Sequence, residues 1–481
     1  MLRRAFLLSA LALVVAPAAD AAPARVLKLQ AERLHRAGQS EREPGGRLVL
    51  LSGRRAALRA TPQVPAVERI SLRARARRCG GWPVVSVSLG GRELARLKVR
   101  SARMHRYAKQ VRVGAGRRPL ELALVNPHRG KRCAREVAID VLELTRRKDE
   151  EFANPAFGAF ADPMVLDLDD QHTDYYAYAT GGYLPMARSD DLVHWRYTGT
   201  ALQSRPAWVP QTGDWNPWAP SVISRPARCP GARRGPCYVM FYSALNASLR
   251  PAANCVAVAL SSSPGGPFVD RGPLQAAGGG TDQSGRPPGC GDDGGYSNID
   301  ADPFVDRDGR AYLYFSTGHA CPPGTAPRSE CPRNSALSVV PLTSNWLRAA
   351  GPRHVVLRNA DPWQQGVVEG PWMRRLGRRY QLFYSGGLFT RGYGMGLATG
   401  RSPMGAFRNW PLNPLLHDSL GVKSAGGGSL VTGPSGQTWV AYHGRPGSYG
   451  ADRLLRLDRL GSSSNGSVAI HGPTMSDQPA P

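Results

Sequence analysis

Short runs of alternating apolar and polar residues recur along the chain, and this period of two is typical of half-buried β-strands rather than of helices. In the N-terminal part, such runs cover residues 84–89, 120–125 and 137–142. Gly90-Gly91 directly after the first run predicts a hairpin turn. We therefore expect residues 22–148 to form an antiparallel β-sandwich.

The residues from 149 to 481 contain a recurring unit, and its most visible part is a short aromatic strand. These strands begin at residues 175, 238, 312, 380 and 439. Most of them follow another strand and a turn, as in Phe304-Val305 with the turn at 306–309. Because one such unit cannot bury both of its faces alone, five of them predict a five-bladed β-propeller. The expected fold class is all-β, with this propeller preceded by the β-sandwich.

Residues 1–21 are typical of a secretory signal peptide. Arg3 and Arg4 form a charged start, an apolar stretch follows to residue 18, and Ala19-Asp20-Ala21 fits the small-x-small cleavage pattern. We expect the mature chain to begin near Ala22 and to be secreted, either extracellular or periplasmic. Beyond this segment no apolar run approaches about 18 residues, so we expect no membrane-spanning role.

Eight cysteines in an exported chain argue for disulfides, because an oxidising compartment preserves them. Eight cysteines allow about 105 pairings, so proximity in sequence supplies only a hypothesis. The pairs that it favours are Cys229–Cys237, Cys321–Cys331, Cys255–Cys290 and, by what remains, Cys79–Cys133. Since no two cysteines have the C-x2-C spacing, a zinc site is disfavoured.

The formal net charge of +26 is concentrated in residues 22–148, where 31 Lys and Arg face 9 Asp and Glu. Such an excess suits a polyanionic partner, although an Arg-rich composition without a partner explains it equally well. The segment contains two aromatic residues of the Phe, Trp and Tyr types, Trp82 and Tyr107. It therefore lacks the aromatic residues that alternate with basic ones in proteins that bind single-stranded nucleic acids. We therefore expect no nucleic-acid partner.

The turn at residues 77–83, with Cys79-Gly80-Gly81-Trp82-Pro83, and the tail at 133–140 make residues 26–145 resemble small secreted xylan-binding modules. The resemblance implies a carbohydrate-binding domain and supports the Cys79–Cys133 pair. Pro127 and Glu136 depart from the family, which has Asp and Asn there, and this weakens its calcium site. A stabilising β-domain without a ligand remains the alternative. We place the boundary in the charged segment 145–152, with domains at 1–21, 22–148 and 149–481.

Carboxylates recur in the strands expected to line the propeller channel. Three of the five carry one at a similar point in the repeat, namely Asp162, Asp300 and Glu369. Converging carboxylates repel one another and lose solvation, which a purely structural core avoids. The same arrangement suits an acid and a base acting on a glycosidic bond.

Several motifs make this part strongly resemble family 43 glycoside hydrolases, over about 300 residues and in the family's order. They are Asp162-Pro163, the W-A-P-x-V of 218–222, the I-D-x-x-x-F-x-D-x-D-G of 299–309, the E-G-P of 369–371 and the W-x-x-Y-H of 439–443. The resemblance implies a hydrolase of arabinose- or xylose-containing polysaccharides: arabinan, arabinoxylan or xylan of the plant cell wall. Arabinofuranosidase, xylosidase, galactosidase and arabinanase activities share these motifs.

Roles follow motif by motif from this resemblance. Asp162 would be the general base that activates water, and Glu369 the general acid that protonates the leaving oxygen. Asp300 would be the third carboxylate, which orients the acid and raises its pKa. Asp302 is the rival for that third role, whereas Asp306 and Asp308 fit an Asp-x-Asp-Gly turn better. The expected outcome is inversion, with the working carboxyls about 6.5–9.5 Å apart.

Trp218 and His443 are the expected substrate-binding residues, with blade packing as the alternative for Trp218 and Trp215. We expect no required cofactor and assign no metal ligand, and we leave undecided whether the channel holds a structural calcium ion. Ser221 stands where the family often has Asp, and Gly427 where the last blade commonly has His. A non-catalytic, carbohydrate-binding propeller is therefore the alternative function. We expect a monomer.

Overall fold

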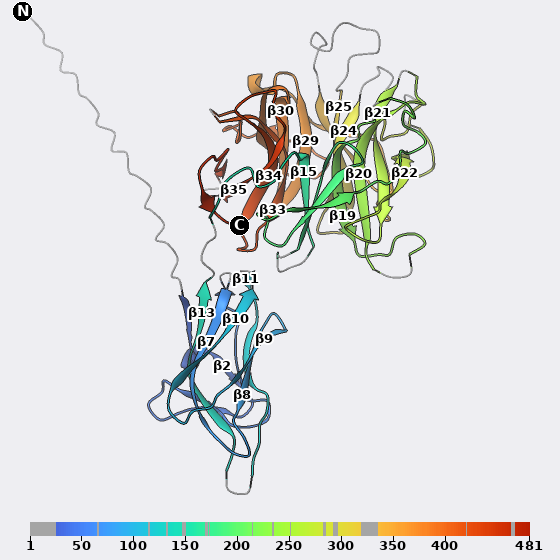
Figure 1. Ribbon diagram of the computed structural model, residues 1–481. Helices are drawn as coiled ribbons and strands as arrows, with labels where there is room; N and C mark the ends of the chain where they lie inside the picture. The colour runs from blue at the N-terminus through green and yellow to red at the C-terminus, as the bar shows by residue number, and fades with distance from the viewer. Residues whose placement is uncertain are drawn as a thin grey trace, which may run out of the picture. The chain divides into compact units, whose positions relative to one another are not determined.

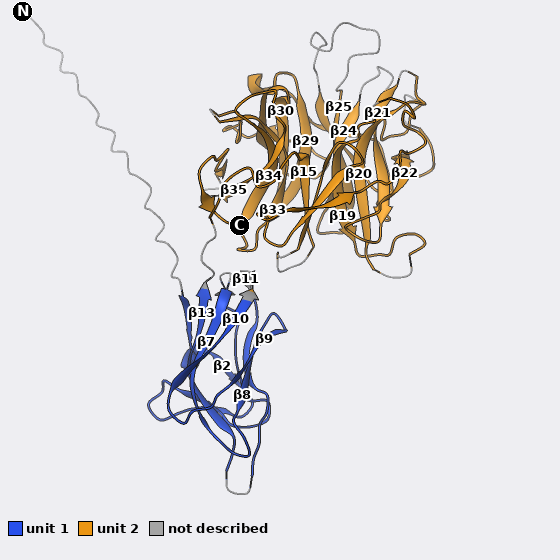
Figure 2. Cartoon of the chain, in the orientation of Figure 1, with its two compact units in different colours: residues 1–112, 118–148 blue, residues 113–117, 149–481 orange. Residues whose placement is uncertain are grey.

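The computed structural model describes residues 26–481 except 65–66, 114–115, 131–132, 147–150, 169–171, 173, 214, 233–234, 251, 282–284, 292–296, 319–334, 420 and 463–466. The expected signal peptide and the expected Cys321–Cys331 pair lie outside the described residues. The chain divides into two compact units (Figure 2), of residues 1–112 with 118–148 and of residues 113–117 with 149–481. Nearly all regular structure in the described residues is β, and the helices among them are the short 3-10 helices η1 (Ala31–Arg33) and η2 (Pro362–Gln364).

Unit 1 contains two antiparallel sheets (Figure 1), and the strands expected at 84–89, 120–125 and 137–142 are present in them. One sheet has the order β10 (His105–Val113), β7 (Val67–Arg77), β13 (Glu136–Arg146), β4 (Val49–Leu51) and β3 (Ser40–Arg42), and β1 (Val26–Gln30) also pairs with β13. The other has the order β2 (His35–Ala37), β5 (Ala57–Ala60), β12 (Leu120–Leu124), β8 (Val84–Leu89) and β9 (Arg92–Lys98).

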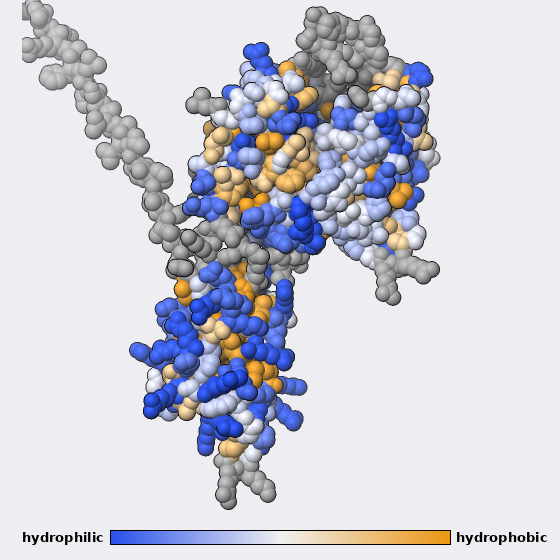
Figure 3. All heavy atoms as spheres, in the orientation of Figure 1, coloured by the Kyte–Doolittle hydropathy of each residue, from blue (hydrophilic) through white to orange (hydrophobic). Residues whose placement is uncertain are grey.

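Alternation explains why these strands pack. Val85, Val87 and Leu89 in β8 are buried, as are alternate leucines of β12, so each strand contributes one apolar face to a core. Hydrophilic side chains cover much of the face of unit 1 that Figure 3 shows. Some acidic residues of unit 1 form ion pairs, for example Asp140 with Arg73 and Glu143 with Arg106.

Unit 2 contains five four-stranded antiparallel sheets, numbered here in chain order (Figure 1). The first has β15 (Ala161–Asp167), β16 (Tyr175–Thr180), β17 (Pro185–Ser189) and β18 (Arg196–Thr200). The second has β19 (Trp218–Arg225), β20 (Cys237–Asn246), β21 (Ala253–Ser261) and β22 (Val269–Pro273). The third has β24 (Asn298–Val305), β25 (Ala311–Thr317), β26 (Ala336–Pro341) and β28 (His354–Arg358).

The fourth sheet has β29 (Val368–Leu376), β30 (Arg379–Leu388), β31 (Arg391–Gly400) and β32 (Arg408–Asn409). The fifth has β33 (Val422–Thr432), β34 (Thr438–Pro446), β35 (Leu454–Ser462) and β36 (Val468–Ile470). Two small pairings accompany them, β14 (Glu151–Phe152) with β37 (Gln478–Pro479) and β23 (Gln275–Ala276) with β27 (Arg348–Ala349). The five aromatic runs of the sequence are the second strands of the five sheets.

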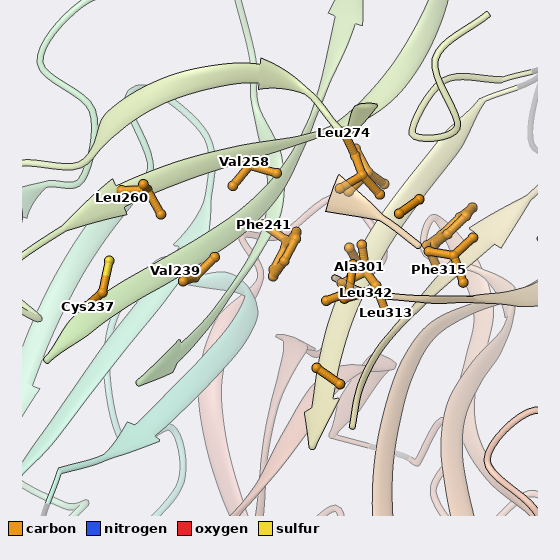
Figure 4. Close-up of a cluster of buried hydrophobic side chains, with 14 of the residues drawn as sticks. Cys237, Val239, Phe241, Val258, Leu260, Leu274, Ala301, Leu313, Phe315 and Leu342 are labelled. Atoms are coloured by element: carbon orange, nitrogen blue, oxygen red, sulfur yellow. The ribbon is translucent and has the colours of Figure 1, made fainter. Parts of the chain in front are cut away.

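The five sheets contact one another in a closed order. The first strand of each sheet contacts that of the next, and β33 of the fifth sheet contacts β15 of the first. Five clusters of buried apolar side chains lie between neighbouring sheets, one at each of these junctions. Figure 4 shows the cluster between the second and third sheets, where Phe241 and Val258 face Leu313 and Phe315. Burial on both faces explains why the second strands are almost wholly apolar.

In the part of the chain that the structure describes, three disulfides close loops within the units: Cys79–Cys133 in unit 1, and Cys229–Cys237 and Cys255–Cys290 in unit 2. All three pairs are those that the sequence favoured. Among the described residues, no helix has the length and apolar character needed to cross a membrane.

Candidate active site

The first strand of every sheet in unit 2 is interrupted at the same place in its pairing with the second strand. The register shifts by one residue between Ala161 and Met164 in β15, and the other four first strands repeat this shift. The first residue of each bulge has a positive φ: Asp162 50°, Ala219 40°, Asp300 58°, Gly370 54° and Gly427 59°. Bulges re-aim side chains and are frequent beside active sites, and a positive φ in a residue other than glycine marks strain that such sites retain.

This register separates the three expected carboxylates into two classes. Asp162 and Asp300 occupy the bulge itself, whereas Glu369 lies one position earlier, at the place of Trp218 in the second sheet. The similar point of the repeat that the sequence indicated thus consists of two adjacent positions. In the fourth sheet the bulge position belongs to Gly370, the neighbour of Glu369.

The second strands hold the bulges in place across the sheet junctions. Thr180 accepts a hydrogen bond from the Ala219 amide, and Ser243 from the Asp300 amide, at 2.8 and 3.0 Å. Ser385 accepts one from the Gly427 amide at 2.8 Å. In the fifth sheet the equivalent residue is His443, whose Nδ1 accepts the Asp162 amide at 3.1 Å. An imidazole thus replaces a hydroxyl at the junction that carries Asp162.

Asp162 is surrounded by groups that favour its charged form. Nη1 of Arg453 lies 3.0 and 3.1 Å from its two carboxylate oxygens, and the Thr180 hydroxyl donates to Oδ2 at 2.6 Å. Burial alone would raise the pKa of this carboxyl, but Arg453, His443 and Thr180 outweigh it and hold the pKa well below its usual range. Asp162 is therefore ionised at any pH near neutrality and is able to accept a proton from water.

Asp300 has the opposite environment. Burial raises its pKa well above the usual range, and the carboxylates of Glu369 and Asp162 raise it further. The Gly370 amide donates to its Oδ2 at 3.1 Å, which ties Asp300 to the residue after Glu369. Asp300 and Glu369 lie close enough to influence one another's protonation, so they titrate as a pair. Glu369 itself accepts a hydrogen bond from the Tyr393 hydroxyl at 2.6 Å.

A cavity of about 50 Å³ lies among the five bulges. Its lining includes Asp162, Asp300, Ser221, Trp372 and Ser429, so each first strand contributes to it. Asp302 also lines it, and burial raises the pKa of this carboxyl to about 8. Its oxygens accept hydrogen bonds from the Met373 amide at 2.9 Å and the Ser221 hydroxyl at 3.4 Å. Asp302 thus joins the second, third and fourth sheets, and Ser221 is its partner.

The remaining candidate residues do not line this cavity. Trp218 is partly exposed beside the bulge of β19, and the buried Trp215 packs in the apolar cluster between the first and second sheets. His443 has no exposed surface, so it lies behind Asp162 rather than in contact with solvent. Asp306 begins a turn, as expected, with the Gly309 amide donating to its carbonyl. Its carboxylate also accepts hydrogen bonds from Arg375 and Tyr380, which the sequence did not indicate.

The residues that line the channel do not fit a structural calcium ion, which the sequence analysis had left undecided. Asp162 is taken by Arg453, and Asp302, with its raised pKa, is a poor ligand near neutrality. Over the part of the chain that the structure describes, no cluster of three or more His, Cys, Asp or Glu side chains is arranged to hold a metal ion.

The geometry agrees with what comparison with known proteins finds. The family model of glycosyl hydrolases family 43 matches residues 152–468. The chain belongs to this family. Family 43 membership makes it a glycoside hydrolase.

This family 43 chain is 28% identical over 310 residues to the β-D-galactofuranosidase xynD of Aspergillus niger. The aligned region covers 63% of this chain and 78% of that relative. It is similar to the crystal structure of a thermostable family-43 glycoside hydrolase, with a TM-score of 0.54, 26% identity and coverage of 69% of this chain and 99% of the other. An α-L-arabinofuranosidase from Lactobacillus brevis shares the fold, with a TM-score of 0.50, 14% identity and coverage of 67% and 97%.

Sequence reasoning missed Arg453 and Tyr393, which contact Asp162 and Glu369 directly. Neither belongs to a motif, and in a chain with 62 Lys and Arg one more arginine carries no signal. The glycine run 426–428 was the available hint, because glycine in a strand interior often marks a close approach of other groups.

Proposed function

We propose that this family 43 enzyme hydrolyses arabinose- or xylose-containing polysaccharides or oligosaccharides with inversion, as an α-L-arabinofuranosidase, β-xylosidase or arabinanase. The observation that carries the proposal is the contrast between two carboxyl sites. Arg453 helps to hold the pKa of Asp162 below its usual range, while burial and the carboxylate of Glu369 raise the pKa of Asp300. Titratable groups pushed in opposite directions are the mark of a base and an acid.

In the proposed reaction a water molecule attacks the anomeric carbon and loses a proton to Asp162. The bond from that carbon to the glycosidic oxygen breaks, and Glu369 gives its proton to the leaving oxygen. Asp300 stays beside Glu369 and favours the protonated acid before transfer. Attack and departure on opposite faces of the sugar give the inverted anomer. Trp218, which holds in the second sheet the position that Glu369 holds in the fourth, supplies an aromatic surface for a sugar ring.

The proposal includes the wider architecture. Five sheets with a closed order of contacts and five junction clusters support a five-bladed β-propeller for residues 149–481. The two sheets of unit 1 support a β-sandwich for residues 22–148, which we propose as a carbohydrate-binding module. The disulfides and the leader-like segment 1–21 support a secreted enzyme, and we propose that it is a monomer.

Sugar identity is tested by a panel of aryl α-L-arabinofuranoside, β-D-xyloside and β-D-galactofuranoside, together with linear arabinan and arabinoxylan. The galactofuranoside is included because the relative xynD is named for it, and its ring has the same configuration as that of an α-L-arabinofuranoside. We expect release from the arabinofuranoside or the xyloside. Exclusive release from the galactofuranoside would contradict the sugar assignment while leaving the chemistry intact.

The site assignment is tested with Asp162→Asn and Glu369→Gln, which remove a proton acceptor and a proton donor without changing side-chain size. Each should lower kcat by at least about 100-fold on a glycoside with a poor leaving group. Asp308→Asn, at an exposed turn, is the matched control and should retain full activity. A Glu369→Gln enzyme that folds and retains wild-type turnover would overturn the assignment.

A further inference from the structure

A single aromatic side chain connects the surroundings of the two working carboxylates. Tyr393, in β31, is 2% exposed and donates its hydroxyl proton to Oε1 of Glu369 at 2.6 Å. Its ring stacks on the imidazole of His443, with 5.6 Å between the ring centres and an angle of 11°. His443 in turn bonds the Asp162 amide through Nδ1. The chain of contacts therefore runs from Glu369 through Tyr393 and His443 to Asp162.

The glycine run of β33 creates the space for this stack. A Cβ atom at Gly426 would lie 2.5 Å from Cδ1 of Tyr393. A Cβ atom at Gly427 would lie 2.6 Å from Cε1 of His443 and 2.8 Å from Oδ1 of Asp162. Real Cβ atoms do not approach other atoms this closely, so larger residues would displace the two rings. The unusual backbone of β33 is thus explained by the rings that it admits.

His443 also stands out among its equivalents. The first, second and fourth sheets use a Thr or Ser hydroxyl to bond the next bulge, and these hydroxyls do not stack on an aromatic ring. An imidazole at this place presents a flat face that a hydroxyl lacks. Burial lowers the pKa of His443, so the ring is neutral near pH 7 and stacks without the cost of a buried charge.

We propose that Tyr393 is a positioning residue that aligns the general acid Glu369 through its hydroxyl and supports the base Asp162 through its ring. The inference rests on the function proposed above. With Oε1 accepting the Tyr393 proton, the proton that Glu369 transfers belongs on Oε2, which gives the acid one defined orientation. After transfer the same hydroxyl stabilises the new carboxylate, because a hydrogen bond to a charged acceptor is stronger than one to a neutral acceptor. The ring separately limits the movement of His443 and hence of the Asp162 backbone.

The role of the Tyr393 hydroxyl and the role of its ring are distinguished by comparing substrates whose leaving groups differ in basicity. Protonation by Glu369 matters for a phenyl glycoside, whose leaving oxygen is basic, and hardly matters for a 2,4-dinitrophenyl glycoside, whose leaving oxygen is not. Tyr393→Phe keeps the ring and removes the hydroxyl. It should lower kcat about 10- to 100-fold on the phenyl glycoside and less than about 3-fold on the dinitrophenyl glycoside of the same sugar. Tyr393→Leu removes the ring as well and should lower both.

Tyr384→Phe is the matched control, because Tyr384 is also buried and bonds Gln364 and Asn409, away from the carboxylates. It should lower the melting temperature without any dependence of kcat on the leaving group. Equal losses on both substrates in Tyr393→Phe, or no loss on either, would overturn the proposal. A wild-type enzyme inactive on all aryl glycosides, or a fully active Glu369→Gln, would instead refute the proposed function and is distinguishable from failure of this inference.

Discussion

Replacement of Arg453 by glutamine should move the acidic limb of the pH–rate profile to higher pH. Arg453 contributes the only positive side chain in hydrogen-bond contact with Asp162 among the described residues, apart from any charge on His443. Without it, burial of the Asp162 carboxyl is opposed only by neutral hydrogen bonds, and its pKa rises. A general base works only when ionised, so the enzyme loses activity at a higher pH than the wild type as the solution is acidified.

The size of this shift follows from the contact. A unit charge pair about 4 Å apart at an effective dielectric constant of about 20 is worth about 4 kcal/mol, which corresponds to about 3 pKa units. The Asp162 side chain is 20% exposed, so solvent screens part of the interaction. We therefore expect the limb to move by about 1 to 2 pH units.

The assay is kcat/KM against pH on an aryl glycoside, with the melting temperature recorded at each pH. Arg459→Gln is the matched control, since Arg459 lies exposed on β35, close in sequence to Arg453. Its profile should overlay that of the wild type. If Arg453→Gln lost activity by the same factor at every pH, with no movement of the acidic limb, the electrostatic account of Asp162 would be wrong.

Three further expectations concern packing and stability. Gly426→Ala should displace the Tyr393 ring and lower kcat at least about 10-fold, with larger loss on poor leaving groups, and a wild-type rate would contradict the close approach. Because the pKa of Asp302 is raised, its contribution to the free energy of unfolding is full below pH about 4 and is lost as the pH rises toward 8, at about 1.4 kcal/mol per pH unit. Asp302→Asn should remove this pH dependence from the free energy of unfolding measured by calorimetry. An unchanged slope would contradict a protonated Asp302 in the folded state. Replacing both Cys79 and Cys133 by serine removes a disulfide that joins residues 54 positions apart, and it should destabilise unit 1 by about 4 kcal/mol. An unchanged unfolding transition in calorimetry would contradict this expectation.

Much of the fold is predictable because it rests on local patterns. The five aromatic strands are recognisable from composition alone, since second strands buried on both faces have to be apolar throughout. Disulfide pairs close in sequence are predictable for a similar reason, because short loops leave few partners within reach. Cys229–Cys237 and Cys255–Cys290 are such pairs.

The site is less predictable because it depends on register and on distant contacts. Asp162 and Asp300 share the bulge position, whereas Glu369 lies one position before it, and the pairing of first and second strands is what shows which residue of each first strand falls in the bulge. His443 was expected to bind substrate, yet its burial follows from a glycine at 427 in the neighbouring strand. Arg453 reaches Asp162 across 291 positions in sequence, so only the folded chain brings them together.

The stereochemistry of the first product tests the central claim most directly. Proton NMR during the first minutes of hydrolysis of an aryl glycoside records the anomer released before it equilibrates. A base at Asp162 that activates water opposite to Glu369 predicts an anomeric configuration inverted from that of the substrate. Release of the retained anomer would mean that a carboxylate attacks the sugar itself, and it would contradict the roles assigned to Asp162 and Glu369.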